Sequence, residues 1–203
     1  MKRGSSLLAA LLPVVLALPA SRAAEPLSFY VNYSARVPTA PLAAHALSVV
    51  HPNATVDLAG AHEAGATLLA YLSIGEVAGD APYRAEVTQR GLPLAGRNPA
   101  WNSDLIDLTD SRWVDFLVDE LAVAASRRGF DGFFLDTLDS GKLVAPADAA
   151  RTRALQAGIV AVVTRLRAKF PGKRIVINRG FFAFPELRTV VDGVLLESLY
   201  ATH

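Results

Sequence analysis

Short apolar runs alternate along this chain with segments whose apolar residues recur at spacings of three and four. The runs predict strands over 27–32, 47–51, 67–74, 133–135, 174–178 and 193–197. The periodic segments predict helices over 41–46, 56–63, 112–127, 146–170 and 185–190. Such alternation is typical of right-handed βαβ units, and it therefore predicts an α/β protein with a parallel sheet.

Three of the predicted strands end in an acidic residue. Glu76 follows the third run, Asp136 the fourth, and Glu197 closes the sixth. The carboxyl ends of parallel strands are where α/β proteins place their chemistry. Asp136 alone could simply cap a following helix or turn, but the repetition of the pattern favours a functional site.

Strand ends that carry acids favour a TIM (β/α)₈-type barrel over an open sheet, because a barrel gathers side chains from many strands at one mouth. Such a barrel needs eight strands and about 250 residues, whereas only six strands are predicted here. We therefore expect a C-terminally truncated barrel whose reading frame continues past His203. Residues 77–102, which show few periodic apolar positions, are expected to form a long loop with a functional role.

Composition narrows the class of protein only slightly. The 203 residues are 52% hydrophobic and carry a net charge of +1, which suits one globular domain. This near-neutral charge gives no reason to expect nucleic acid or an acidic membrane as a partner. The chain contains no cysteine, so disulfides and thiolate chemistry are excluded.

The amino terminus predicts export. Lys2 and Arg3 precede an apolar run over 7–18, and small residues follow near Ala23. This order predicts a signal peptide over 1–23, a mature domain over 24–203, and a periplasmic or secreted protein. An uncleaved anchor is the alternative, and no later segment is long and apolar enough to span a membrane.

Asp136 and Glu197 are the predicted catalytic pair. Two carboxylates at one mouth can divide the work of glycosidic hydrolysis, one as nucleophile and the other as general acid and base. A sugar-binding site also requires flat apolar surfaces and hydrogen-bonding groups, and residues of both kinds lie near predicted strand ends. The candidate substrate-binding residues are Tyr30, Tyr33, Tyr71, Glu76, Trp101, Asp139, Asn178, Arg179 and Tyr200.

A metal site is the competing use of these acids. The four histidines are scattered and form no His-x-x-His or His-x-x-x-His pair, so we expect neither a metal nor a cofactor. His51 lies at a strand end, where it could reach the site. A Mg²⁺ or Ca²⁺ site built from oxygen ligands alone stays open as an alternative.

Five ordered motifs resemble the TIM-barrel polygalactosaminidases of glycoside hydrolase family 114 and the related family 166. They span nearly the whole mature chain, and the likeness is greatest to members from bacterial Pel polysaccharide systems of biofilms. The motifs are Tyr-Leu-Ser-Ile-Gly-Glu at 71–76, Asp-Leu-Thr-Asp at 107–110, Gly-Phe-Asp-Gly-Phe-Phe-Leu-Asp-Thr-Leu-Asp-Ser at 129–140, Asn-Arg-Gly-Phe at 178–181 and Leu-Glu-Ser-Leu-Tyr at 196–200.

The resemblance implies endo-hydrolysis of α-1,4-linked galactosamine or N-acetylgalactosamine polymers, with Asp136 and Glu197 as the catalytic pair. We assign Asp136 as the nucleophile and Glu197 as the acid/base. The expected partners are a polysaccharide substrate and other polysaccharide-export components. Two alternatives stay open: a non-catalytic carbohydrate-binding or assembly protein, and an enzyme of the same fold with another sugar substrate.

Overall fold

The computed structural model describes residues 27–143 and 148–197. The predicted signal peptide and the candidate residue Tyr200 lie outside these ranges. Within them, no helix combines the length and the apolar character that crossing a membrane requires.

Six parallel strands form one curled sheet in the order β1-β2-β3-β7-β8-β9. Each joins the next through a helical connection, as the alternating pattern predicts. All six predicted strands are confirmed, although β9 ends two residues earlier than expected. The strands are β1 (Phe29–Asn32), β2 (Leu47–Val50), β3 (Thr67–Ser73), β7 (Gly132–Asp136), β8 (Arg174–Asn178) and β9 (Gly193–Leu195).

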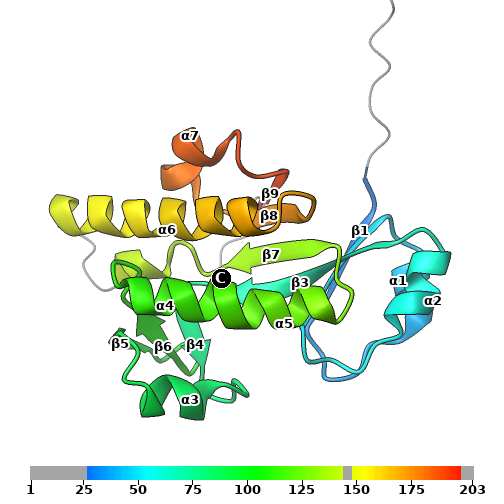
Figure 1. Cartoon of the computed structure of the whole chain (residues 1–203), viewed down its shortest axis with the longest axis horizontal. Coiled ribbons are helices and arrows are strands. Elements are labelled where there is room, and N and C mark those ends of the chain that lie inside the picture. Colours follow the sequence, from blue (N-terminus) through cyan, green and yellow to red (C-terminus); the bar gives the residue numbers. More distant parts are fainter. Residues whose placement is uncertain (1–26, 144–147, 198–203) are drawn as a thin grey trace, which may run out of the picture.

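Helices cover the outer face of this sheet (Figure 1). The longest, α6 (Ala149–Lys169), is capped by Asp148, whose carboxylate accepts the backbone N–H groups of Ala150 and Arg151 at 2.9 and 3.0 Å. The remaining helical elements are α1 (Thr39–Ala43), α2 (Leu58–Glu63), α4 (Ser111–Asp115), η1 (Phe116–Leu121), α5 (Ala122–Arg127), η2 (Ser140–Leu143), η3 (Phe181–Ala183) and α7 (Phe184–Leu187).

Successive side chains of a strand point to opposite sides of the sheet. In this sheet both sets of side chains are apolar, so each face carries an apolar cluster. The larger cluster packs between sheet and helices, and Phe133, Leu135 and Ile177 contribute to it. On the other face Leu47, Val49, Leu69 and Phe134 form what we call the inner cluster. Burial on both sides explains why the strands read as unbroken apolar runs.

Residues 77–102 do not form the irregular loop expected from the sequence, and that prediction is wrong. The chain there begins a second, antiparallel sheet in the order β4-β6-β5, visible beside the main sheet in Figure 1. Its elements are β4 (Glu76–Ala78), α3 (Arg84–Gln89), β5 (Leu94–Asn98) and β6 (Ser103–Ile106). The strands of this sheet are short, and a shift in register between Leu94 and Gly96 interrupts the alternation of side chains in β5. The segment therefore shows little apolar periodicity in its sequence.

Candidate active site

Asp136 ends β7, and the two neighbouring strands each supply a donor to its carboxylate. The Tyr71 hydroxyl of β3 donates to Oδ2 at 2.8 Å, and Asn178 Nδ2 of β8 donates to Oδ1 at 2.8 Å. The strand order β3-β7-β8 places these donors on opposite sides of the acid. The sheet topology therefore builds this part of the site directly.

A third donor comes from the backbone. The Thr137 N–H donates to Asp136 Oδ1 at 2.8 Å. Hydrogen bonds to an ionised group are the strong ones, and three of them fix the rotation of the carboxylate as well as complementing its charge. The side chain of Asp136 is thus preorganised by three hydrogen bonds at the end of a buried strand.

The inner face of the sheet continues into this site. Phe134 belongs to the inner cluster, and Tyr71, Val176 and Leu195 pack against it. Because strand side chains alternate with a period of two, Asp136 and Asn178 lie on the same face as Phe134 and Val176. These polar groups line the mouth at the carboxyl ends of the strands.

Glu197 is exposed and follows the end of β9 by two residues. Burial first, and then the charges of Asp136 and Glu197, raise the pKa of the Tyr33 hydroxyl. A phenol responds in this way only to carboxylates that lie close to it. Both predicted catalytic acids therefore raise the pKa of the same tyrosine.

Tyr33 and Tyr71 form an aromatic wall beside the carboxylate. Their ring centroids are 4.6 Å apart with the planes tilted by 56°. Burial, and then the charge of Asp136, raises the pKa of the Tyr71 hydroxyl above its usual value. Both phenols consequently stay protonated at neutral pH, so Tyr71 can act as a hydrogen-bond donor to Asp136.

His51, which follows β2, extends this wall. Its ring stacks on Tyr71 with the centroids 6.4 Å apart. Burial lowers the pKa of His51, against the charge of Asp80, which raises it. The imidazole is therefore held neutral at neutral pH, as a polar group that adds no positive charge to the mouth.

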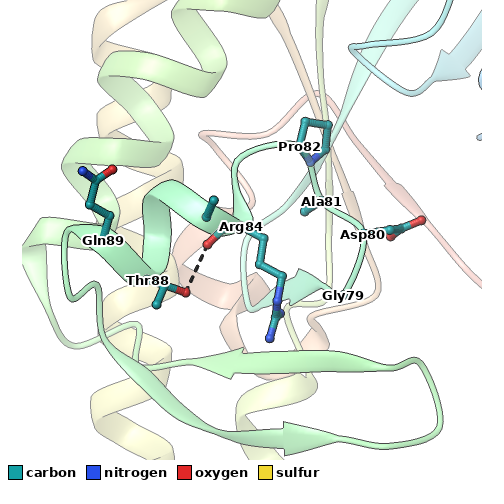
Figure 2. A pocket seen from close by; sticks show the side chains of 8 residues that line it. Gly79, Asp80, Ala81, Pro82, Arg84, Thr88 and Gln89 are labelled. Atoms are coloured by element: carbon teal, nitrogen blue, oxygen red, sulfur yellow. Dashed lines mark hydrogen bonds between the residues drawn. The ribbon is translucent and has the colours of Figure 1, made fainter.

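A surface pocket lies on the segment that follows β4. Figure 2 shows it between residues 79–82 and the first turns of α3, with Asp80, Arg84 and Thr88 among its lining residues. Arg84 Nη2 pairs with Asp104 Oδ2 at 2.5 Å, which ties the helix to β6. None of the predicted site residues lines this pocket.

A family model described as glycoside hydrolase family GH114 matches residues 17–203. The chain belongs to family GH114. No curated protein is similar enough to match it.

Solved structures of glycoside hydrolases share the GH114 chain's fold. The glycoside hydrolase domain of PelA from Pseudomonas aeruginosa is 33% identical with a TM-score of 0.71, and the match covers 84% of this chain and 66% of that one. Ega3 from Aspergillus fumigatus, in complex with galactosamine, is 15% identical with a TM-score of 0.68, over 83% of this chain and 65% of that one.

More distant neighbours share the architecture alone. The α-galactosidase AgaA from Geobacillus stearothermophilus is 11% identical with a TM-score of 0.56, over 84% of this chain and 30% of that one. These neighbours are TIM-barrel glycoside hydrolases, which confirms the predicted TIM-type fold class for the six-stranded sheet. The chain spans just under two thirds of the PelA and Ega3 chains that it matches.

Two further predicted site residues of the GH114 chain contact each other. Arg179 Nε lies 3.5 Å from Asp139 Oδ2, and Lys142 Nζ lies 3.9 Å from the other oxygen of Asp139. Arg179 follows Asn178 directly, and Asp139 lies three residues after Asp136. This ion pair therefore joins the loops after β7 and β8 next to the candidate nucleophile.

Three more of the predicted site residues make contacts with groups other than the Asp136 side chain. Glu76 is only 5% exposed and accepts hydrogen bonds from Asn98 Nδ2 at 3.1 Å and from the Ser103 hydroxyl, inside the small sheet. Trp101 is 78% exposed, in the turn between β5 and β6. Tyr30 packs towards the helices, where its ring stacks on His45 with centroids 5.5 Å apart.

Sequence reasoning missed the residues that hold Thr137 in place and, through the Thr137 N–H, orient the Asp136 carboxylate. Ser73 and Gly75 contact the Thr137 hydroxyl, and Thr137 supplies the third donor to Asp136. All three lie inside the motifs of strands β3 and β7, so their position beside the acids was the available signal. Within the described ranges, no group of three or more His, Cys, Asp or Glu side chains is arranged to hold a metal ion.

Proposed function

We propose that this chain is an endo-acting glycoside hydrolase that cleaves α-1,4-linked galactosamine or N-acetylgalactosamine polysaccharide of the Pel type. Membership of GH114 supports the reaction class. The similarity to the PelA hydrolase domain, and the galactosamine in the Ega3 complex, support the substrate class. The export predicted from residues 1–23 would bring the enzyme to a polysaccharide outside the cytoplasm.

The observation that carries the proposal is the carboxylate of Asp136 with its three donors. A nucleophile must be held in one orientation, and hydrogen bonds from Tyr71, Asn178 and the Thr137 N–H hold the Asp136 carboxyl group in this way. In the first step Asp136 attacks the anomeric carbon while Glu197 gives its proton to the leaving glycosidic oxygen. In the second step Glu197 takes a proton from water, and the resulting hydroxide displaces Asp136 from the sugar.

The surroundings of the two acids suit these roles. Glu197 is exposed, so it can exchange its proton with water between the two steps. Tyr33 and Tyr71 offer flat apolar surface against which a sugar ring can pack. The carboxylate of the nucleophile Asp136 also attracts the ammonium group of a deacetylated amino sugar.

The test is release of oligosaccharides from a galactosamine polymer by the wild type and by Asp136→Asn and Glu197→Gln. Each variant should lose at least about 100-fold in kcat, because each removes a nucleophile or a proton donor. Asp57→Asn and Glu63→Gln are the matched controls. Asp57 caps α2 through the Gly60 N–H, a role that asparagine fills equally well, and Glu63 is exposed on the same helix.

Near-normal turnover in Asp136→Asn or Glu197→Gln would remove that residue from the mechanism. Polymer binding by the wild type without any release of oligosaccharide would favour the non-catalytic alternative. The anomer released, followed by NMR, separates a retaining enzyme, with carboxyl groups about 5–5.5 Å apart, from an inverting one with about 6.5–9.5 Å.

A further inference from the structure

Thr137, the residue after the candidate nucleophile, has an unusual backbone conformation. Its φ is 64°, in the left-handed region. For a β-branched residue this conformation is an outlier, because its side chain crowds the backbone there. Such a residue stays in place only where its surroundings hold it.

The Thr137 hydroxyl is what connects the residue to those surroundings. Oγ1 accepts the Gly75 N–H at 2.9 Å, lies 2.9 Å from Ser73 Oγ, and donates to the Asp136 carbonyl at 2.6 Å. These contacts join the end of β7 to the end of β3. Ser73 and Asp136 are also paired in the register of these two strands.

Residues 74–75, on the β3 side of this connection, are held by hydrogen bonds from buried residues. The Ile74 carbonyl accepts the indole N–H of buried Trp113 at 2.8 Å, and the Gly75 carbonyl accepts the Ile106 N–H at 2.9 Å. A Cβ atom on Gly75 would lie 2.3 Å from the Thr137 carbonyl oxygen, so the two backbones are in close contact. Thr137 therefore rests against a rigid segment.

We propose that Thr137 is a positioning residue for the hydrolysis described above. Its hydroxyl holds the backbone in the left-handed region, and this directs the Thr137 N–H at Asp136 Oδ1, 2.8 Å away. The residue acts through Asp136 and does not touch the sugar. The expected effect on kcat rests on the proposed function. The expected effect on the hydrogen bond between the Thr137 N–H and Asp136 does not depend on turnover.

The kinetic experiment uses the full chain and compares Thr137→Val with Thr137→Ser. Valine keeps the shape and the β-branch but deletes the hydroxyl, whereas serine keeps the hydroxyl. We expect Thr137→Val to lower kcat by about 10- to 100-fold with little change in KM, because a displaced reacting group costs rate rather than binding. Thr137→Ser should restore most of kcat.

A matched control is Thr152→Val. Thr152 also donates its hydroxyl to a backbone carbonyl, that of Asp148, but in helix α6. Thermal melting of all three variants reports general damage to the fold. A lowered melting temperature with kcat per folded molecule unchanged in Thr137→Val would show a purely structural role and overturn the inference.

A second measurement needs no turnover. In a ¹H–¹⁵N NMR spectrum, the amide proton of residue 137 should resonate downfield because it is bonded to a carboxylate. It should move upfield in Thr137→Val and in Asp136→Asn, and stay in place in Thr137→Ser. An unmoved resonance in Thr137→Val would mean that the hydroxyl does not direct this N–H, and would also overturn the inference.

The two measurements separate the proposals. An inactive wild type, or an active Asp136→Asn, contradicts the proposed function and leaves the NMR result to decide the role of Thr137. An inactive Asp136→Asn together with a fully active Thr137→Val supports the function and contradicts the positioning role.

Discussion

Tyr71 combines a packing role with a polar one at the mouth of the sheet. Its ring stacks on His51 and packs at a tilt against Tyr33 and Phe134, and its hydroxyl donates to Asp136. The raised pKa of this phenol ensures that it is a donor and never a second anion beside the nucleophile. Removing only the oxygen separates the two roles.

Tyr71→Phe should therefore lower kcat by about tenfold or more while the protein stays folded. The phenyl ring keeps the stacking contacts, but a charge-assisted hydrogen bond worth about 1.5–3 kcal/mol is lost. Steady-state kinetics on the galactosamine polymer measure the effect.

Tyr83→Phe is the control for this change. Burial raises the pKa of Tyr83 to about 12, and its ring packs on Phe116 at 5.8 Å, but no hydrogen bond to Asp136 is involved. Equal kinetics in the two variants would show that the Tyr71 oxygen contributes nothing specific.

At the scale of elements, sequence patterns predicted the strands well and the insertion poorly. The strands of the main sheet are buried on both faces, so each reads as an apolar run. In β5, by contrast, the sequence Leu-Ala-Gly-Arg-Asn leaves its side chains largely exposed and carries no such signal. The helix predicted over 112–127 is confirmed in extent, but its middle, η1, has π-helical geometry that a spacing of three and four cannot reveal.

The same limit applies to the candidate site. Asp136, Tyr71 and Asn178 could be predicted together because each lies at or near a strand end, and parallel strands bring these ends to one mouth. Glu76 follows the same sequence rule, yet Asn98 and Ser103 bind it inside the small sheet. The support from Ser73, Gly75 and Thr137 depends on one backbone conformation, which residue types alone do not specify.

The contact between the ends of β3 and β7 predicts the effect of Gly75→Ala. The added Cβ would meet the Thr137 carbonyl oxygen, a backbone atom that cannot rotate away, at 2.3 Å. We expect a loss of about 1–3 kcal/mol in the free energy of unfolding, measured with urea, because overpacking forces the backbone apart. Turnover should fall as well, since Thr137 moves with Asp136.

Gly172→Ala is the matched control, because nothing lies within 4 Å of its added Cβ. That variant should be neutral or slightly more stable, since alanine restricts the unfolded chain. If Gly75→Ala is as stable and active as Gly172→Ala, the two strand ends are not in the tight contact described.

At the scale of the whole molecule, the outer strands of the main sheet lead to a prediction about self-association. Within residues 27–143 and 148–197, β1 pairs only with β2, and β9 pairs only with β8. Beside the open side of β1, Leu27 and Phe29 are 57% and 50% exposed. A strand edge with unpaired N–H and C=O groups next to exposed apolar side chains is a template for pairing with another chain.

We therefore expect the protein to self-associate as its concentration rises, and Phe29→Lys to reduce this association. A lysine on an edge strand opposes pairing through charge repulsion and the cost of desolvation. Light scattering coupled to size-exclusion chromatography, over a range of protein concentrations, gives the weight-average mass. Phe184→Lys is the control, because Phe184 is 38% exposed but begins helix α7 rather than lying on a sheet edge. A constant monomer mass for the wild type, or an equal reduction by both substitutions, would show that the β1 edge does not drive association.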